Sequence, residues 1–152
     1  MNGDDRRIFL DTNVLVFANI EEAPLHAVAL DAIQSRERAG REIWISRQVL
    51  REYLATLSRP QTFSPPIPAE KLGTQVRSFM SRFRVAEDTA QITERLLDLI
   101  QQFPTGGKQV HDANIVATML VHNIPALLTH NTDDFARFSG IITVLPLDAN
   151  VS

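Results

Sequence analysis

Acidic side chains occur at four separated places in the sequence where they could share one chemical task. Each lies directly after an apolar run that is typical of a strand, or at the edge of an apolar helical face. The group comprises Asp11, Glu52, Asp112 and one short segment with Asn131, Asp133 and Asp134. Carboxylates that meet in a water-poor crevice cannot all stay ionised without a cation, because like charges raise each other's pKa. If they converge, the sequence predicts a site for a divalent cation.

The available ligands indicate which ion and which reaction to expect. The chain has no cysteine, so the ligands would be oxygens, and oxygen ligands favour Mg²⁺ or Mn²⁺. Such an ion neutralises a phosphate, lowers the pKa of a bound water and supports in-line attack on phosphorus. Hydrolysis of phosphodiesters is therefore the reaction that this set of residues favours.

Each acid also has a simpler interpretation when it is taken alone. Asp11 could cap the first helix, Glu52 could be a surface charge, and Asp112 could lie favourably in a helix N-terminal turn. Asn131 and Asp134 could form a start to a short helix that resembles a capping box. The joint occurrence of these residues at strand ends favours the shared site.

The elements that must position these residues alternate along the chain. Short apolar runs without polar alternation, each followed by a helical pattern, predict a five-stranded parallel sheet covered on both faces. The ligand crevice of such a sheet lies outside the carboxyl ends of its strands. The predicted strands are 7–11, 43–45, 84–86, 126–129 and 142–145. The predicted helices follow a cap at Thr12 or Asn13, Pro24, a cap at Ser46 and a cap near Asp88 or Thr89, and three more lie within 72–83, 110–121 and 132–138. Leu54, Met80 and Leu97 are assigned to the apolar faces of these helices.

Composition favours one ordinary globular domain over residues 1–152. The 152 residues are 44% hydrophobic, which suffices for one core and leaves little for a second. The polar N-terminus does not resemble a signal peptide, and no apolar stretch approaches the roughly 20 residues needed to cross a bilayer. We expect a soluble, cytoplasmic protein with no membrane association.

The net charge of −3 hides an uneven distribution. Residues 36–84 hold ten basic and four acidic side chains, a net +6, while the rest holds five basic and fourteen acidic ones, a net −9. Nine of the ten basic residues are arginine, whose planar fork suits phosphate. This segment is predicted either to line an RNA groove or face an acidic peptide, or to be a solvated, arginine-rich surface.

Four motifs, in order along nearly the whole chain, resemble the PIN domain family. They are IFLDTNVLVF with Asp11, REYL with Glu52, HDANIVATM with Asp112, and LLTHNTDDF with Asn131 and Asp134. The resemblance implies a Rossmann-like three-layer α/β/α fold with a central, mainly parallel five-stranded sheet. It also implies a metal-dependent ribonuclease similar to the VapC toxins of toxin–antitoxin pairs, which commonly form homodimers and are silenced by a small antitoxin.

The resemblance assigns roles to particular residues. Asp11, Glu52 and Asp112 match the first three metal-binding acids of the family. The fourth role could fall on Asn131 or Asp134; we favour Asp134, with Asn131 as an orienting group. Thr12 and Asn13 match small polar residues that help to hold the site, and Asp133 is expected to be a solvent-facing cap.

The sequence therefore predicts an Mg²⁺- or Mn²⁺-dependent endoribonuclease, the toxin of a toxin–antitoxin pair. A phosphatase of the haloacid dehalogenase type is one alternative, but its D-x-D motif is replaced here by Asp11-Thr12-Asn13. The other alternative is a PIN-like module that binds RNA or a partner without cutting.

Other possible motifs carry less weight. Gly107-Lys108 resembles the end of a phosphate-binding loop, but positions 102 and 109 are both glutamine, so we expect a turn. The four histidines show no paired metal-binding spacing, and only His111 and His130 lie beside proposed site residues. Trp44 is expected to belong to the core rather than to stack on a base.

Overall fold

A single five-stranded parallel sheet organises the part of the chain that the computed structural model describes, residues 6–151. Its strand order is β3-β2-β1-β4-β5, so β1 is central and the chain crosses from one side of β1 to the other after β3. The five predicted strands are all present, with ends that agree to within one residue. They are β1 (Arg7–Leu10), β2 (Glu42–Ser46), β3 (Arg84–Ala86), β4 (Ala126–Leu128) and β5 (Thr143–Leu145).

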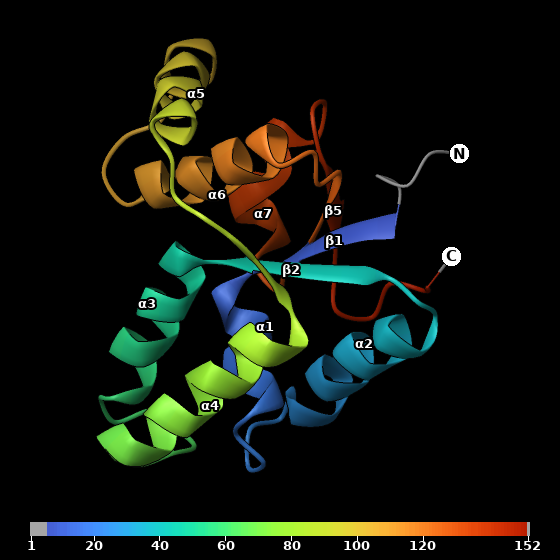
Figure 1. The fold of residues 1–152 in the computed structure, drawn as a ribbon, viewed down its shortest axis with the longest axis vertical. Helices are drawn as coiled ribbons and strands as arrows, with labels where there is room; N and C mark the ends of the chain where they lie inside the picture. Colours follow the sequence, from blue (N-terminus) through green and yellow to red (C-terminus); the bar gives the residue numbers. More distant parts are fainter. Residues whose placement is uncertain (1–5, 152) are drawn as a thin grey trace.

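Helices cover both faces of this sheet and confirm the expected three-layer α/β/α architecture. Helices α1 to α4 lie on one face and α5 to α7 on the other (Figure 1). The first set is α1 (Thr12–Ala18), α2 (His26–Arg38), α3 (Arg47–Leu57) and α4 (Ala69–Arg82). The second is α5 (Ala90–Gln102), α6 (Gln109–Val121) and α7 (Thr132–Phe135), which the 3₁₀-helix η2 (Ala136–Phe138) extends.

Local hydrogen bonds explain where several helices begin. The hydroxyl of Ser46 accepts from the backbone N–H of Val49 and caps α3, as predicted. Thr89, not Asp88, caps α5. The first helix differs from the prediction, because the side chain of Asp11 is the cap and accepts from the N–H of Thr12. Asp11 therefore caps α1, in addition to any role in a shared site.

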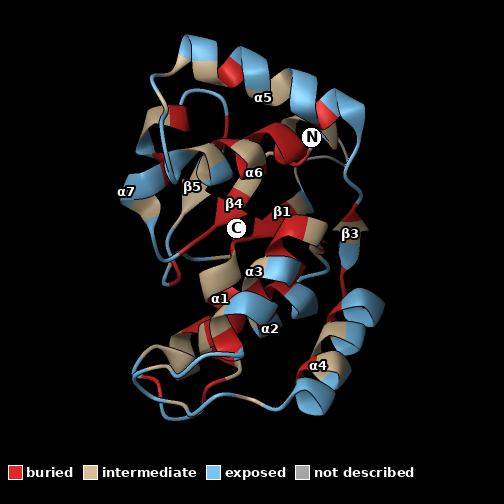
Figure 2. Cartoon of the chain, turned by 90° about the vertical axis from the view of Figure 1, so that its left-hand side faces the viewer, coloured by how far each residue is buried: buried red, intermediate tan, exposed pale blue. Residues whose placement is uncertain are grey.

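Burial is concentrated in the sheet and in the helices that touch it directly (Figure 2). Helix α6 is buried on most sides because it lies between the sheet and α5. Three residues assigned to apolar helical faces are instead partly exposed: Leu54 (37%), Met80 (39%) and Leu97 (43%). Leu54 and Met80 each follow a buried residue and Leu97 follows a half-buried one, so the buried stripe is narrower than the run of apolar residues suggests.

The strand register places the ends of β1 and β4 side by side. Leu10 pairs with Leu128, so the residues that follow them, Asp11 and Thr129, are neighbours at the carboxyl edge. The backbone N–H of Asp11 continues the ladder by donating to the Leu128 carbonyl at 3.0 Å.

Within residues 6–151, none of the helices is both long and apolar enough to cross a membrane.

Candidate active site

Asp11 is buried at the carboxyl end of the central strand and is held by several donors. Its Oδ1 accepts from the Thr12 N–H at 2.8 Å. Its Oδ2 accepts from the hydroxyl of Thr129 at 2.8 Å and from Nδ2 of Asn13 at 3.0 Å. Burial raises the pKa of Asp11, with Glu52 adding to the rise, while the hydrogen bonds from Thr129, Thr12 and Asn13 oppose it. The carboxyl group is therefore fixed in direction but costly to ionise.

Glu52 reaches the same region from the first half of α3. The hydroxyl of Thr12 donates to its Oε1 at 2.7 Å, and Nε2 of Gln48 donates to its Oε2 at 3.3 Å. Residues Gln48 and Glu52 are one helical turn apart, so their side chains share a face of α3. Both carboxylate oxygens of this half-buried side chain are thus oriented by neighbours.

Asp112 lies in the first turn of α6, on the opposite face of the sheet from α3. Burial raises its pKa to about 6, and the charges of Asp11, Asp134 and Glu52 contribute to this rise. Arg137 has the opposite effect and lowers the pKa. The four acids therefore act on one another electrostatically although they come from four segments.

The polar residues that follow β4 differ in whether they line the cavity. Asn131, Asp133 and Asp134 are all exposed, and Asn131 makes no side-chain cap on α7. Asn131 lines the cavity described below, whereas Asp134 does not line it and is linked to the site through the effect of its charge on the pKa of Asp112. The capping-box interpretation of Asn131 is therefore wrong.

A cavity of about 470 Å³ joins three of the four acids. The cavity opens at the carboxyl end of the sheet, between α1, α3, α6 and the proline-rich loop after α3, residues 59–68. Its lining residues are Asp11, Thr12, Asn13, Val16, Phe17, Glu52, Ala55, Thr56, Gln61, Asp112 and Asn131. The structure thus brings together Asp11, Glu52 and Asp112, together with the supporting residues Thr12, Asn13 and Asn131.

The acids share a cavity without forming a closed ligand shell. No three His, Cys, Asp or Glu side chains in residues 6–151 are already gathered as a complete metal-binding group. Their hard oxygen atoms and mutual repulsion nevertheless fit Mg²⁺ or Mn²⁺, because such ions usually take only one or two protein carboxylates directly and fill the other positions with water and substrate.

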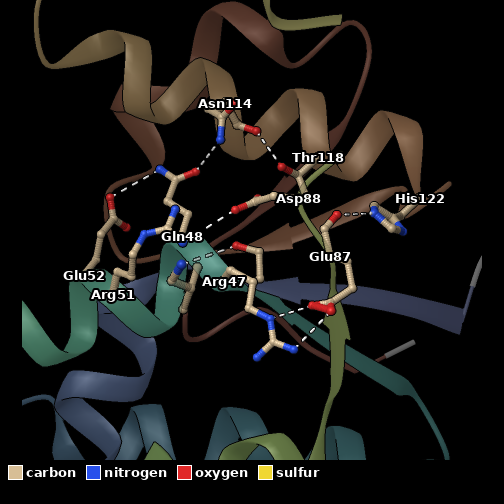
Figure 3. A network of polar contacts seen from close by, with 11 residues as sticks. Arg47, Gln48, Arg51, Glu52, Glu87, Asp88, Asn114, Thr118 and His122 are labelled. Carbon is tan, nitrogen blue, oxygen red and sulfur yellow. Dashed lines mark hydrogen bonds and ion pairs between the residues drawn. The ribbon is translucent and has the colours of Figure 1, made fainter. Parts of the chain in front are cut away.

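Several positioning residues were not found by sequence reasoning. Gln48 is 6% exposed, and its Nε2 also donates to the His111 carbonyl at 2.9 Å. Nδ2 of Asn114 in turn donates to Oε1 of Gln48 at 2.7 Å, so this glutamine links α3 to α6 (Figure 3). The sequence feature that indicates this role is the position of Gln48 four residues, or about one helical turn, before Glu52. Thr129 had a weaker signal, because its contact with Asp11 depends on strand register.

Two other predictions have mixed outcomes. Gly107 adopts a φ of 58° in the turn before α6, which confirms that this motif is a turn. Trp44 is not fully in the core, since it is only half-buried and its Nε1 donates to Oε1 of Glu42 at 2.8 Å. The guanidinium groups of Arg7 and Arg84 lie 5.8 and 6.0 Å from the centre of its indole ring.

Much of the positive charge in residues 36–84 is paired within the fold. Arg36 is buried, where its guanidinium donates to the backbone carbonyls of Ala32 and Ala149. Five other arginines of this segment lie in ion pairs: Arg38 with Asp31, Arg47 with Glu87, Arg51 with Asp88, Arg82 with Glu37 and Arg84 with Glu42. The surface is therefore less strongly basic here than the sequence suggests.

Comparison with known proteins places this arrangement in a family. The PIN domain model matches residues 8–141. The chain belongs to the PIN domain family. This match spans all four acidic segments and confirms the resemblance carried by the sequence motifs. It gives no support to the haloacid dehalogenase alternative, whose second acid is replaced by Asn13.

Solved toxin–antitoxin proteins have the same fold as this PIN domain. VapBC2 from Rickettsia felis, bound to a promoter DNA fragment, matches with 22% identity and a TM-score of 0.66, covering 92% of this chain and 98% of that chain. A toxin–antitoxin complex from Klebsiella pneumoniae matches with 26% identity and a TM-score of 0.61, covering 94% and 99%. VapC20 from Mycobacterium tuberculosis, a sarcin–ricin loop cleaving toxin, matches with 21% identity and a TM-score of 0.65, covering 91% and 99%. No curated protein sequence matches significantly.

Proposed function

We propose that this PIN domain is an Mg²⁺- or Mn²⁺-dependent endoribonuclease. The observation that carries the proposal is the cavity at the carboxyl end of the sheet, lined by Asp11, Glu52 and Asp112. RNA is favoured as the substrate because the similar protein VapC20 is a sarcin–ricin loop cleaving toxin. Asp134 is proposed as the fourth acid because its charge acts on Asp112.

The four acids would hold the ion, and the surrounding residues prepare them for it. When bound, Mg²⁺ or Mn²⁺ neutralises phosphate charge and lowers the pKa of a coordinated water. Thr129 and Asn13 fix the direction of the Asp11 carboxylate, and Thr12 with Gln48 fixes that of Glu52. Because these donors are already in place, little side-chain freedom is lost when the cation binds.

The wider proposal is that the chain is the toxin of a toxin–antitoxin pair. The similar solved structures from Rickettsia felis and Klebsiella pneumoniae are such pairs. We expect a small antitoxin protein as partner, a homodimer of the PIN domain, and action in the cytoplasm. Light scattering of the purified chain tests the dimer, and copurification with the protein encoded beside it tests the antitoxin.

Cleavage of a labelled RNA tests the proposed reaction. We expect cleavage with Mg²⁺ or Mn²⁺ and none with EDTA. Asp11→Asn and Asp112→Asn should each lower the rate by at least about 100-fold, since the ion supplies several kcal/mol of charge stabilisation. Asp133→Asn is the matched control and should retain the rate. Full activity of either Asp11→Asn or Asp112→Asn would remove that acid from the site.

Growth on expression tests the toxin assignment separately. Expression of the chain alone should arrest growth, and the Asp11→Asn variant at equal abundance should not. Normal growth with abundant, active protein would exclude the toxin role and leave the nuclease proposal intact.

A further inference from the structure

The acid-lined cavity is larger than a metal site requires. Its volume is about 470 Å³, whereas one water occupies about 30 Å³ of liquid. Space therefore remains for part of a substrate after an ion and its waters have been accommodated. The wall formed by α1 beyond the acids is apolar, and its largest member is the aromatic side chain of Phe17.

Helix α1 carries both the polar and the aromatic part of the cavity. Asn13, Val16 and Phe17 all line it, as residues three and four apart on one helical face do. Asp11 and Phe17 are six positions apart in the sequence, a rise of about 9 Å along the helix. A nucleobase extends over a comparable distance from the phosphate of its own nucleotide. Phe17 therefore lies about as far along α1 from Asp11 as a base lies from its own phosphate.

His130 supports Phe17 from outside the residues that line the cavity. Its imidazole packs against Phe17 with ring centres 5.5 Å apart and planes at 87°. The His130 side chain is exposed, while Phe17 is half-buried and packs partly on the core. Oδ1 of Asn13 accepts from the His130 backbone N–H at 3.0 Å, and Nδ2 of the same Asn13 donates to Asp11. One asparagine therefore connects the aromatic pair to the acidic end of the cavity.

We propose that Phe17, supported by His130, forms a subsite that stacks one unpaired nucleobase of the RNA substrate. The inference rests on the proposed action on RNA and specifies its substrate class: a single-stranded or looped segment, because only an unstacked base can enter between side chains. Stacking is tolerant of sequence, since every base has a π-face. Stacking also binds RNA without the help of basic side chains, which suits a cavity whose other wall is acidic.

Binding of RNA that contains 2-aminopurine tests the subsite. A set of short single-stranded RNAs, each with the fluorescent base at a different position, is titrated into the cleavage-deficient Asp11→Asn variant. One position should show quenched fluorescence. Adding Phe17→Leu, which keeps an apolar side chain but removes the π-face, should abolish this quenching and weaken binding about 5-fold or more. Phe63→Leu is the matched control, because Phe63 is 45% exposed and does not line the cavity.

Further measurements separate stacking from a structural role. In the active chain, Phe17→Leu should raise KM about 5-fold or more while kcat and Mn²⁺ affinity stay within about twofold. Phe17→Trp keeps a π-face and should bind at least as tightly as Phe17. The proposal is overturned if Phe17→Leu binds RNA like the parent, if Phe17→Trp binds no better than Phe17→Leu, or if Phe17→Leu loses Mn²⁺ affinity.

The same experiments distinguish failure of the subsite from failure of the nuclease. If the unaltered chain binds RNA with Phe17-dependent quenching but cuts none of the RNAs with Mg²⁺ or Mn²⁺, the nuclease proposal fails and the subsite stands. If the chain cuts RNA with the same KM in the Phe17→Leu variant, the subsite fails and the nuclease proposal stands.

Discussion

Asp112 lies in an environment that opposes its charge. The first turn of a helix ordinarily favours an anion, yet the pKa of Asp112 is raised to about 6 by burial and then by the charges of Asp11 and Asp134. Desolvation and repulsion therefore outweigh the helix dipole. A metal-free site at neutral pH contains carboxylates that destabilise the fold.

This conflict predicts that Asp112→Asn stabilises the metal-free protein at neutral pH. The folded-state pKa lies above the ordinary aspartate value of 3.8, so the folded state binds more protons between about pH 4 and 6. The contribution of Asp112 to stability therefore falls as pH rises through this window. Discounted for its partial exposure, the effect is about 1 kcal/mol, or about 2 to 4 °C in Tm. Thermal melts in EDTA should show the variant melting higher at pH 7.5 and equally below pH 4. Equal Tm values at both pH values would contradict the prediction.

Thr129 is expected to matter for the metal as well as for the fold. Thr129→Val keeps the shape of this fully buried residue but removes the donor to Oδ2 of Asp11. We expect a loss of about 1.5 to 3 kcal/mol in unfolding free energy and about a 10-fold loss of Mn²⁺ affinity by calorimetry. Thr118→Val is the control, because Thr118 is equally buried and donates to a backbone carbonyl of α6. Equal Mn²⁺ affinities in the two variants would remove Thr129 from the site.

Sequence reasoning located the acids better than the residues that hold them. Asp11 could be found because it ends an apolar run, and the ends of parallel strands share one edge. The bond between Thr129 and Asp11 follows from the pairing of Leu10 with Leu128, and no local pattern specifies that register. The choice between Asn131 and Asp134 similarly depends on how a four-residue helix is oriented.

At the scale of elements, Gln48 holds α3 and α6 together across the edge of the sheet. It joins Glu52 on its own helix to the His111 carbonyl and the Asn114 side chain on α6 (Figure 3). Asp112 directly follows His111 in the sequence. One nearly buried amide therefore sets the relative position of two proposed metal-binding acids.

Gln48→Leu should consequently impair both stability and metal binding. The change leaves the His111 carbonyl and the Asn114 amide without this partner, at an expected cost of about 1 to 3 kcal/mol in unfolding free energy. Mn²⁺ affinity should fall about 10-fold, because Glu52 loses an orienting donor. Asn114→Ala removes one of the two contacts between Gln48 and α6 and leaves those to Glu52 and the His111 carbonyl, so it should lower Tm with a smaller loss of affinity. Identical Mn²⁺ affinities in the two variants would mean that Gln48 has only a structural role.

The order of elements was largely predictable, whereas their exposed faces were not. Short apolar runs and helix caps such as Ser46 are local signals, and they gave all five strands. Leu54 and Leu97 were assigned to apolar helical faces but are exposed. The sequence does not show how wide a strip of each helix is covered by its neighbours. Trp44 was misjudged for the same reason, since its outer side is covered by arginines.

At the scale of the whole molecule, tertiary contacts redistribute the charge that the sequence concentrates. The basic segment 36–84 is partly neutralised by carboxylates from beyond it, such as Glu87 and Asp88. Within residues 6–151, the acids of the cavity have no comparable set of arginine partners, and the charge of Arg137 lowers the pKa of Asp112. The fold therefore retains an acidic centre while pairing many of its arginines elsewhere.

An unneutralised acidic centre makes the stability of the entire fold depend on divalent cations. A ligand that binds only the folded state stabilises it by about 2.7 kcal/mol at 100 times its Kd, which corresponds to about 5 to 10 °C in Tm for a chain of this size. Mn²⁺ should produce such a shift in the unaltered protein and little or none in Asp11→Asn. Asp134→Asn should reduce the shift. Asp133→Asn should keep it and is the matched control, because the two aspartates are adjacent, exposed and equal in charge. If Asp134→Asn kept the full shift and Asn131→Ala lost it, the fourth ligand would be the amide that lines the cavity, and the electrostatic link between Asp134 and Asp112 would serve only to raise the pKa.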